Sequence, residues 1–249
     1  MQNRPMTETE VAHPPIVTRE EWLQQRVALL KEEKEHTRAG DRLAAKRRRL
    51  PMVPVEKQYT FEGPEGKRSL LDLFDGRRQL IVYHFMFDPK WENGCPGCTS
   101  YVDTLGPGTI PFLRERDTSF VLVSRAPLPK LEAYKAKKGW SAPWYSSFES
   151  DFNYDFHATN DKSKAPIMYN YMDEAQLTAR RGEGNVEGED HSLSVFFRIG
   201  DEVFHTYQAF ARSTESMGTG YGLLDVTPYG RQEDFEDSPT GWPQHPTYG

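Results

Sequence analysis

Cysteine and long apolar runs are both scarce in this sequence of 249 residues. The apolar runs, such as Phe120–Val123, have the length of a strand, whereas a membrane-spanning helix needs about 18 to 20 residues. We therefore expect no membrane segment. The two cysteines are too few for a disulfide scaffold. The N-terminal region lacks the apolar stretch of a signal peptide, which favours the cytoplasm.

The composition is that of a globular protein with one core. Hydrophobic residues make up 37% of the sequence and charged residues 27%, which excludes a collagen or a wholly disordered chain. The length predicts one domain of roughly 170 to 200 residues with extensions at both ends. The net charge of −6 argues against nucleic acid as the main partner.

The N-terminal region reads as a loose segment followed by a helical arm. Residues 1–15 are polar and contain prolines, and the arm covers 16–52. Apolar residues at helical spacing predict one long helix over 19–49, with a candidate break at Gly40. Its basic end, Lys46–Arg49, has no aromatic residues between the charges, which argues against nucleic-acid binding. We interpret the segment as a solvated helix that packs on the domain or on a second subunit.

Residues 53–231 alternate between strand and helix patterns. The run 79–87 is apolar on both faces, as a central strand should be. Further elements are a helix over 96–105, a strand over 119–124, a helix over 127–138, a hairpin over 193–208 and a helix over 214–226. Strand–helix–strand units pair in parallel and the hairpin joins antiparallel, so we expect an α/β fold with a mixed sheet covered by helices on both faces.

Two further segments have less regular patterns. Aromatic residues alternate along 151–156, which predicts a strand or an ordered loop that packs in the core. The tail, 232–249, is acidic and contains prolines, and we expect it to be extended or to dock on a neighbour. Because the arm ends in basic residues, the two ends could meet between subunits of a homo-oligomer.

The two cysteines, Cys95 and Cys98, follow the predicted central strand and open a predicted helix. Pro96 suits the first helical turn, where its missing N–H costs nothing. Free N–H groups at a helix start stabilise a thiolate on Cys95, and Cys98 lies one turn further on the same face. This arrangement predicts a redox dithiol in which Cys95 attacks and Cys98 resolves, with no other cofactor.

Two other interpretations of the cysteines remain open. They could be half of a zinc site, although such a site needs four ligands and no second cysteine pair exists. Only histidines could complete it from within the ordered region, namely His84, His157, His191 and His205. The cysteines could also be inert in a redox-dead member of a redox fold. We expect no metal.

The sequence around the cysteines resembles a bacterial family of thioredoxin-like character, a domain of unknown function whose members are called predicted dithiol–disulfide oxidoreductases. The run Gln79–Phe87 and the motif Trp91-Glu92-x-Gly94-Cys95-Pro96-x-Cys98 carry the resemblance. Further matches are Glu20–Leu23, Ser124–Leu128, Lys138–Trp140, Asp151–Phe156, Leu193–Phe196 and Asp225–Arg231. The resemblance covers about residues 16–231 and implies a thioredoxin-like fold.

One position departs from the thioredoxin pattern. Thioredoxin-like proteins usually place a cis-proline before the first hairpin strand, and here that place falls at His191-Ser192-Leu193. A cis bond without proline costs about 2.5 to 4 kcal/mol, so we expect a trans bond. The departure puts in doubt whether a protein substrate binds as it does in thioredoxin. It leaves the thiol chemistry itself possible.

Three residues are candidates to support the cysteines. Arg125 follows the second buried strand, so it could lie near Cys95 and favour its thiolate, or be an ordinary surface arginine. Trp91 precedes the cysteines and could shield them, meet a substrate or pack in the core. His191 lies at the mouth of the hairpin and could face the site.

Three other polar residues have weaker claims. Asp88 and Glu92 are candidates to accept the proton of Cys98, although solvated loop carboxylates are common. His84 lies within the central strand, and we interpret it as a core histidine.

The leading hypothesis is a cytoplasmic thiol–disulfide oxidoreductase that acts on a protein or small-molecule disulfide and draws electrons from a cellular thiol reductant. One alternative is a thiol peroxidase that forms a sulfenic acid on Cys95, because the strand and short helix before the central strand resemble those of peroxiredoxins. Another is a binding or redox-sensing module without catalysis, which assembles through the N-terminal helix and the tail.

Overall fold

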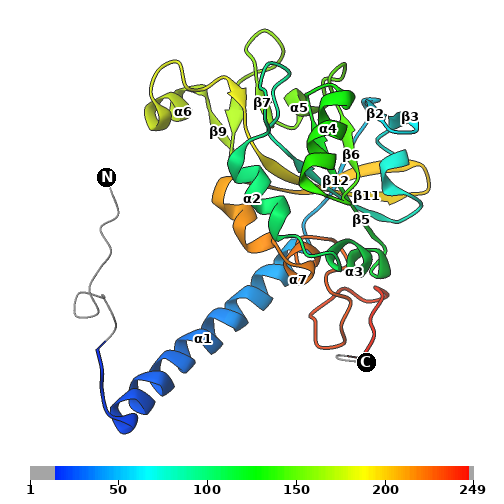
Figure 1. Cartoon of the computed structure of the whole chain (residues 1–249). Coiled ribbons are helices and arrows are strands. Elements are labelled where there is room, and N and C mark those ends of the chain that lie inside the picture. The colour runs from blue at the N-terminus through cyan, green and yellow to red at the C-terminus, as the bar shows by residue number, and fades with distance from the viewer. Residues whose placement is uncertain (1–14, 247–249) are drawn as a thin grey trace. The chain divides into compact units, whose positions relative to one another are not determined.

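The computed structural model describes residues 15–246 (Figure 1). The chain divides into two compact units between Leu43 and Ala44. Apart from residue 15, the predicted loose segment 1–15 lies outside the described residues.

The helices are α1 Arg19–Arg47, η2 Asp72–Phe74, α2 Pro96–Thr104, α3 Thr109–Glu115, α4 Leu128–Lys138, α5 Phe152–Asp155, α6 Glu174–Arg181, η3 Ala211–Met217 and α7 Gly220–Leu224. The strands are β1 Val53–Pro54, β2 Thr60–Gly63, β3 Gly66–Ser69, β4 Gln79–His84, β5 Thr118–Ser124, β6 Trp144–Ser146, β7 Thr159–Asn160, β8 Met168–Tyr169, β9 Met172–Asp173, β10 Gly188–Glu189, β11 Ser192–Ile199 and β12 Glu202–Phe210.

Helix α1 is continuous, so the break expected at Gly40 is wrong. Its start is fixed by a reciprocal cap: the Glu21 N–H donates to Thr18 Oγ1, and the Thr18 N–H donates to the Glu21 carboxylate. One exposed glycine costs a helix only about 1 kcal/mol relative to alanine, which the strong helix formers around Gly40 offset. Within residues 15–246, no helix has the length and apolar character needed to cross a membrane.

The main sheet has the strand order β1-β12-β11-β4-β5-β6-β2-β3. Strands β4, β5 and β6 are parallel, whereas β11 runs antiparallel to β4 and pairs with β12 as a hairpin. The hairpin turns at Gly200-Asp201, where Gly200 has a φ of 59° that glycine adopts without strain. This order, with a helix after the central strand β4, is the thioredoxin-like arrangement, and the predicted mixed sheet is confirmed.

Both faces of the sheet are covered by apolar residues. Successive side chains of β4 point to opposite faces, so they join different clusters. Ile81 and Tyr83 join one buried cluster with residues of α2, α3, α4 and α7. Leu80 and Val82 join a second cluster with residues of β2, η2 and the segment around α5. The central strand therefore connects two apolar layers, and the cysteine helix α2 belongs to the first.

Two segments differ from their predicted form. Residues 152–155 form a turn of helix, α5, rather than a strand, because Phe152 and Phe156 lie four residues apart on one helical face and both reach the core. The single helix expected over 214–226 is divided into η3 and α7. The division falls at Thr219, whose hydroxyl caps α7 by accepting from the Gly222 N–H.

Residues 158–190 form a small layer of short strands and the helix α6, which Figure 1 shows at one edge of the domain. Strand β7 pairs with β10 and β8 pairs with β9, while a capping box at Asp173 starts α6. Its apolar residues pack with the end of β12 in a third cluster, which contains Ile167, Tyr169, Leu177, Val186 and Phe210.

The acidic tail has no helix over the described residues 232–246, but it is docked on the rest of its own chain. The Arg48 guanidinium donates to the Glu236 carboxylate at 2.8 Å, and the two side chains are 2% and 4% exposed. Arg49 forms a more exposed ion pair with Asp237. Arg48 and Arg49, at the basic end of the arm, thus meet the acidic tail of their own chain.

The buried ion pair predicts an unequal effect of two neighbouring tail substitutions. Glu236→Ala leaves the Arg48 cation buried without its partner and should lower the free energy of unfolding by about 3 to 5 kcal/mol. Asp237→Ala removes an exposed partner of Arg49 and should change it by less than about 1 kcal/mol. Urea unfolding of both variants measures the difference, and equal effects would show that the tail is not docked as described.

Candidate active site

Cys95 is the residue that immediately precedes helix α2, and its side chain is partly exposed. Pro96 is the first residue of the helix, where no backbone donor is needed. The Cys95 N–H donates to the Met86 carbonyl at 3.0 Å, which ties the loop back to the end of β4. Gly94 is buried, and a Cβ there would lie 2.6 Å from Phe85 Cε1, so the close approach requires glycine.

The environment of Cys95 lowers the pKa of its thiol to about 5. The largest cause is a hydrogen bond with the Cys98 side chain, followed by the opposing effect of burial. Backbone N–H groups of Cys98 and Gly97 and the charge of His191 also favour the thiolate. Cys95 is therefore ionised at neutral pH.

Cys98 has the opposite character. Its side chain is buried, and both cysteines are free thiols. Hydrogen bonding to Cys95 raises the pKa of the Cys98 thiol, and burial raises it further. The Met86 N–H and the Tyr83 hydroxyl act against these effects, because both are placed to hydrogen bond with a Cys98 thiolate. One reactive thiolate thus lies beside one protonated, protected thiol.

His191 is the predicted supporting residue whose charge lowers the pKa of Cys95. It directly precedes β11, whose first residue, Ser192, pairs with His84 at the end of β4. Its position is fixed by a 3.3 Å contact from Nε2 to the Ala211 carbonyl and by the Tyr169 hydroxyl, which donates to the His191 carbonyl at 3.0 Å. No cis peptide bond occurs in residues 15–246, so the trans bond expected here is confirmed.

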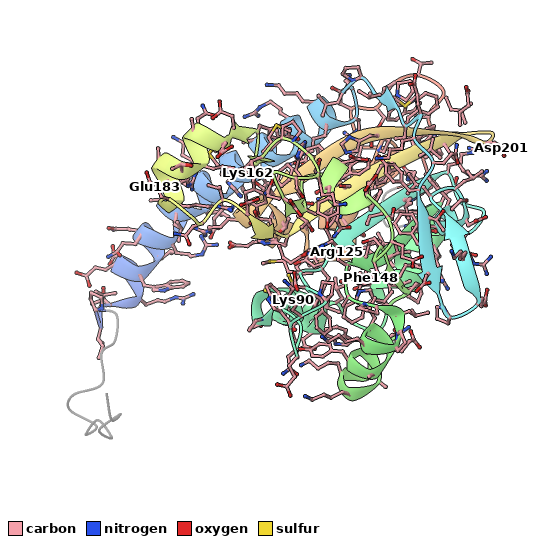
Figure 2. All side chains as sticks on the ribbon, turned by 90° about the horizontal axis from the view of Figure 1, so that it is seen from above. Lys90, Arg125, Phe148, Lys162, Glu183 and Asp201 are labelled. Atoms are coloured by element: carbon pink, nitrogen blue, oxygen red, sulfur yellow. The ribbon has the colours of Figure 1, made fainter. Side chains whose placement is uncertain are left out.

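Arg125 lies in an ion-pair cluster at the same end of the domain. Its Nε donates to Glu189 at 2.7 Å, and its Nη2 donates to Asp88 at 2.9 Å. Figure 2 shows Arg125 and Lys90 on one side of the domain, away from Asp201 at the hairpin tip. Burial raises the pKa of Glu189, and Arg125 opposes this shift. The guanidinium charge is therefore compensated by two carboxylates.

The remaining candidates, Asp88, Glu92 and Trp91, all lie on the loop between β4 and the cysteines. The Asp88 carboxylate accepts from Arg125 and from the Lys90 N–H, and Glu92 is exposed. Trp91 lies on the loop before the cysteines and is 38% exposed.

His84 is a core histidine, as predicted. Its Nε2 lies 2.9 Å from Ser194 Oγ, and its ring stacks on Phe152. Burial lowers its pKa to about 3, so the imidazole stays neutral. The residues that it contacts lie on one face of the sheet, and Tyr83 and the cysteines lie on the other.

Sequence reasoning missed two tyrosines beside the thiols. The Tyr83 hydroxyl hydrogen bonds with Cys98, and its ring stacks on Tyr101 with centroids 4.3 Å apart. Tyr101 donates to the Met217 carbonyl at 2.9 Å. The alternation of β4 and the spacing of three from Cys98 to Tyr101 could have placed both on the thiol side.

Over the part of the chain that the structure describes, no group of three or more histidine, cysteine or acidic side chains lies close enough together to hold a metal ion.

The fold and the site define a thioredoxin-like protein with a cysteine pair at the start of the helix that follows its central strand. The family model described as "Bacterial protein of unknown function (DUF899)" matches residues 11–248, so the chain belongs to that family. Among curated proteins, no sequence matches this chain significantly.

Solved structures similar to this chain include several peroxiredoxins. Peroxidoxin BcpB from Mycobacterium tuberculosis is 12% identical over 71% of this chain and 96% of its own, with a TM-score of 0.49. A mutant of PrxQ from Xylella fastidiosa is 16% identical over 64% and 85%, with a TM-score of 0.40. A mutant of peroxiredoxin Q from Xanthomonas campestris is 18% identical over 64% and 87%, with a TM-score of 0.42.

The site predicts how alkylation of Cys95 depends on pH. Because its pKa is lowered, the thiolate is present above about pH 5 and is lost as the pH falls through that value. The rate of reaction with iodoacetamide should therefore rise near pH 5 and stay flat from pH 6 to 8. Cys98→Ala removes the main hydrogen-bond donor and should move the midpoint upward, whereas Cys98→Ser keeps a donor and should move it less. A wild-type midpoint above pH 8, measured by mass spectrometry of the Cys95 peptide, would contradict this assignment.

Proposed function

We propose that the protein is a thiol–disulfide oxidoreductase that uses Cys95 as nucleophile and Cys98 as resolving thiol. The observation that supports this proposal is the asymmetry of the pair: Cys95 is partly exposed with a lowered pKa, and Cys98 is buried with a raised pKa. An attacking thiol must be ionised and accessible, whereas a resolving thiol must stay protected until the mixed disulfide forms.

The first step is attack of the Cys95 thiolate on a substrate disulfide. The bond from Cys95 to one substrate sulfur forms, the substrate disulfide breaks, and the other substrate sulfur leaves as a thiolate. Cys95 is then neutral, so Cys98 no longer donates to a negative sulfur. The cause that most strongly raises the pKa of Cys98 is thereby removed.

In the second step, Cys98 loses its proton to the departing thiolate or to water and attacks Cys95. The Tyr83 hydroxyl and the Met86 N–H are placed to stabilise the Cys98 thiolate as it forms. The Cys95–Cys98 disulfide forms and the second substrate sulfur leaves reduced. A cellular thiol reductant then supplies the two electrons that restore the dithiol, which fits the cytoplasmic location expected from the sequence.

The low pKa of Cys95 also bears on the direction of exchange. A stabilised thiolate favours the reduced form of the protein, as in strongly oxidising members of this class of enzymes. We infer a reduction potential above the value of about −270 mV that is typical of thioredoxin.

The two cysteine variants separate the two roles. Cys95→Ser should abolish disulfide exchange, because no ionised thiol remains at the partly exposed position. Cys98→Ser should keep the first step and accumulate mixed disulfides, which non-reducing mass spectrometry detects. Full turnover of a model disulfide by Cys95→Ser would contradict the mechanism.

A second candidate is a thiol peroxidase, and the segment before β4 favours it. As the sequence predicts for this alternative, strands β2 and β3 and the short helix η2 lead directly into the central strand. The Cys95 thiolate would attack a peroxide oxygen, giving a sulfenic acid and an alcohol or water, and Cys98 would then form the disulfide and release water. In the same variant series, peroxide consumption that survives in Cys98→Ser with an external thiol, together with absent disulfide exchange, would favour this candidate.

A further inference from the structure

A cavity of about 490 Å³ lies between the end of α1, the outer part of the β11–β12 hairpin and the C-terminal segment. One of its lining residues, Phe197, pairs with Gln79 at the first position of β4, whereas the cysteines follow the last position. The cavity is therefore at the opposite end of the central strand from the thiols. All of its lining residues belong to the unit that begins at Ala44.

One wall of the cavity is a row of aromatic rings. Phe197 and Tyr229 meet edge to face with centroids 5.4 Å apart, and Tyr229 and Trp242 do so at 5.5 Å. The backbone N–H of Tyr229 donates to the Gln79 side chain at 2.9 Å, which fixes the row to the start of β4. Val226 and Pro228 extend this apolar surface.

The facing wall carries three consecutive arginines, Arg47, Arg48 and Arg49. Arg49 and Arg48 are ion-paired with the tail, but Nε of the buried Arg48 has no hydrogen-bond partner among the described residues. Arg47 contacts the Tyr207 ring and forms no ion pair with any residue of 15–246. Pockets of this size bind ligands through apolar walls and a few polar groups, and Arg47 is the lining arginine whose charge no carboxylate of residues 15–246 compensates.

We propose that this cavity binds a small amphipathic monoanion. Its aromatic or aliphatic body contacts the Phe197–Tyr229–Trp242 row, and its one carboxylate pairs with the Arg47 guanidinium. The apolar body follows from the ring row, because an anion that is polar throughout would leave these rings without a contact. The ligand is expected to carry one negative charge because Arg47 is the one lining arginine without a carboxylate partner among the described residues. The inference is independent of the chemistry proposed for the cysteines.

The test uses the full-length protein and a pair of probes that differ in charge. Binding of 8-anilinonaphthalene-1-sulfonate is followed by fluorescence, and it is displaced with 1-naphthoate or with the neutral 1-naphthalenemethanol. We expect one saturable site and displacement by naphthoate at concentrations at least about tenfold lower than by the alcohol, because a charged hydrogen bond contributes at least that factor.

Arg47→Gln should weaken naphthoate binding about tenfold or more and leave the alcohol nearly unchanged. Arg212→Gln is the matched control, since it removes the same charge from a side chain that is 90% exposed and does not line the cavity. Trp242→Ala should weaken both probes by removing part of the apolar wall. Naphthoate should raise the Tm of the wild type and of Arg212→Gln, but not that of Arg47→Gln.

Three results would overturn the proposal: no saturable binding of the fluorescent anion, equal displacement by the acid and the alcohol, or equal effects of Arg47→Gln and Arg212→Gln. Unliganded melting curves show whether each variant is folded. Because Arg47 is only partly buried and has no carboxylate partner among the described residues, its substitution tests the ligand site without removing an internal ion pair.

Discussion

The hydrogen bond between the Cys98 and Cys95 side chains is the interaction on which the rest of the site depends. It is the largest cause of the lowered pKa of Cys95, and it raises the pKa of Cys98. The bond therefore holds the single proton of the reduced pair on the buried sulfur. The accessible sulfur carries the charge, so the proposed mechanism assigns the attacking role to Cys95 and the resolving role to Cys98 without a separate catalytic base.

The fold supplies the geometry that this bond needs. Strand β4 ends at His84, and the buried Gly94 lets the following loop return close enough for Cys95 to stand at the N-cap of α2. The same strand places Tyr83 below Cys98, while the start of β11 brings His191 to the thiolate. The neighbouring elements β4 and α2 and the distant start of β11 thus converge on one pair of sulfur atoms.

Sequence patterns predicted those helices and strands that a few neighbouring residues are enough to specify. The two-faced apolar run of β4, Pro127 and Gly139 at the ends of α4, and Gly200-Asp201 in the hairpin each specify an element within a few residues. The patterns failed where the partner is remote. Arg125 binds Glu189, which is 64 positions away, and Arg48 binds Glu236 across 188 positions. The opposite charges of the two ends indicated a contact, but the particular partners of Arg48 and Arg125 could not be predicted from local spacing.

The residues around Phe152 show a different reason for failure. Aromatic residues at 152, 154 and 156 fit a two-residue repeat, but the pair four apart also fits a helical turn, and packing against Phe196 decides between them. The apolar run 79–87 predicts a buried strand, and the burial of Tyr83 agrees with that. Its hydroxyl contact with Cys98 depends on how α2 packs on the sheet, which one strand cannot specify.

The most direct test of the account is a redox titration of the purified protein. The protein is equilibrated in thiol buffers from about −120 to −300 mV, the range of known oxidoreductases, and its free thiols are counted by alkylation and mass spectrometry, with zinc measured in parallel. The account predicts one two-electron transition, in which Cys95 and Cys98 are oxidised together at a potential above that of thioredoxin. Cysteines that stay reduced throughout, or that carry stoichiometric zinc, would contradict it.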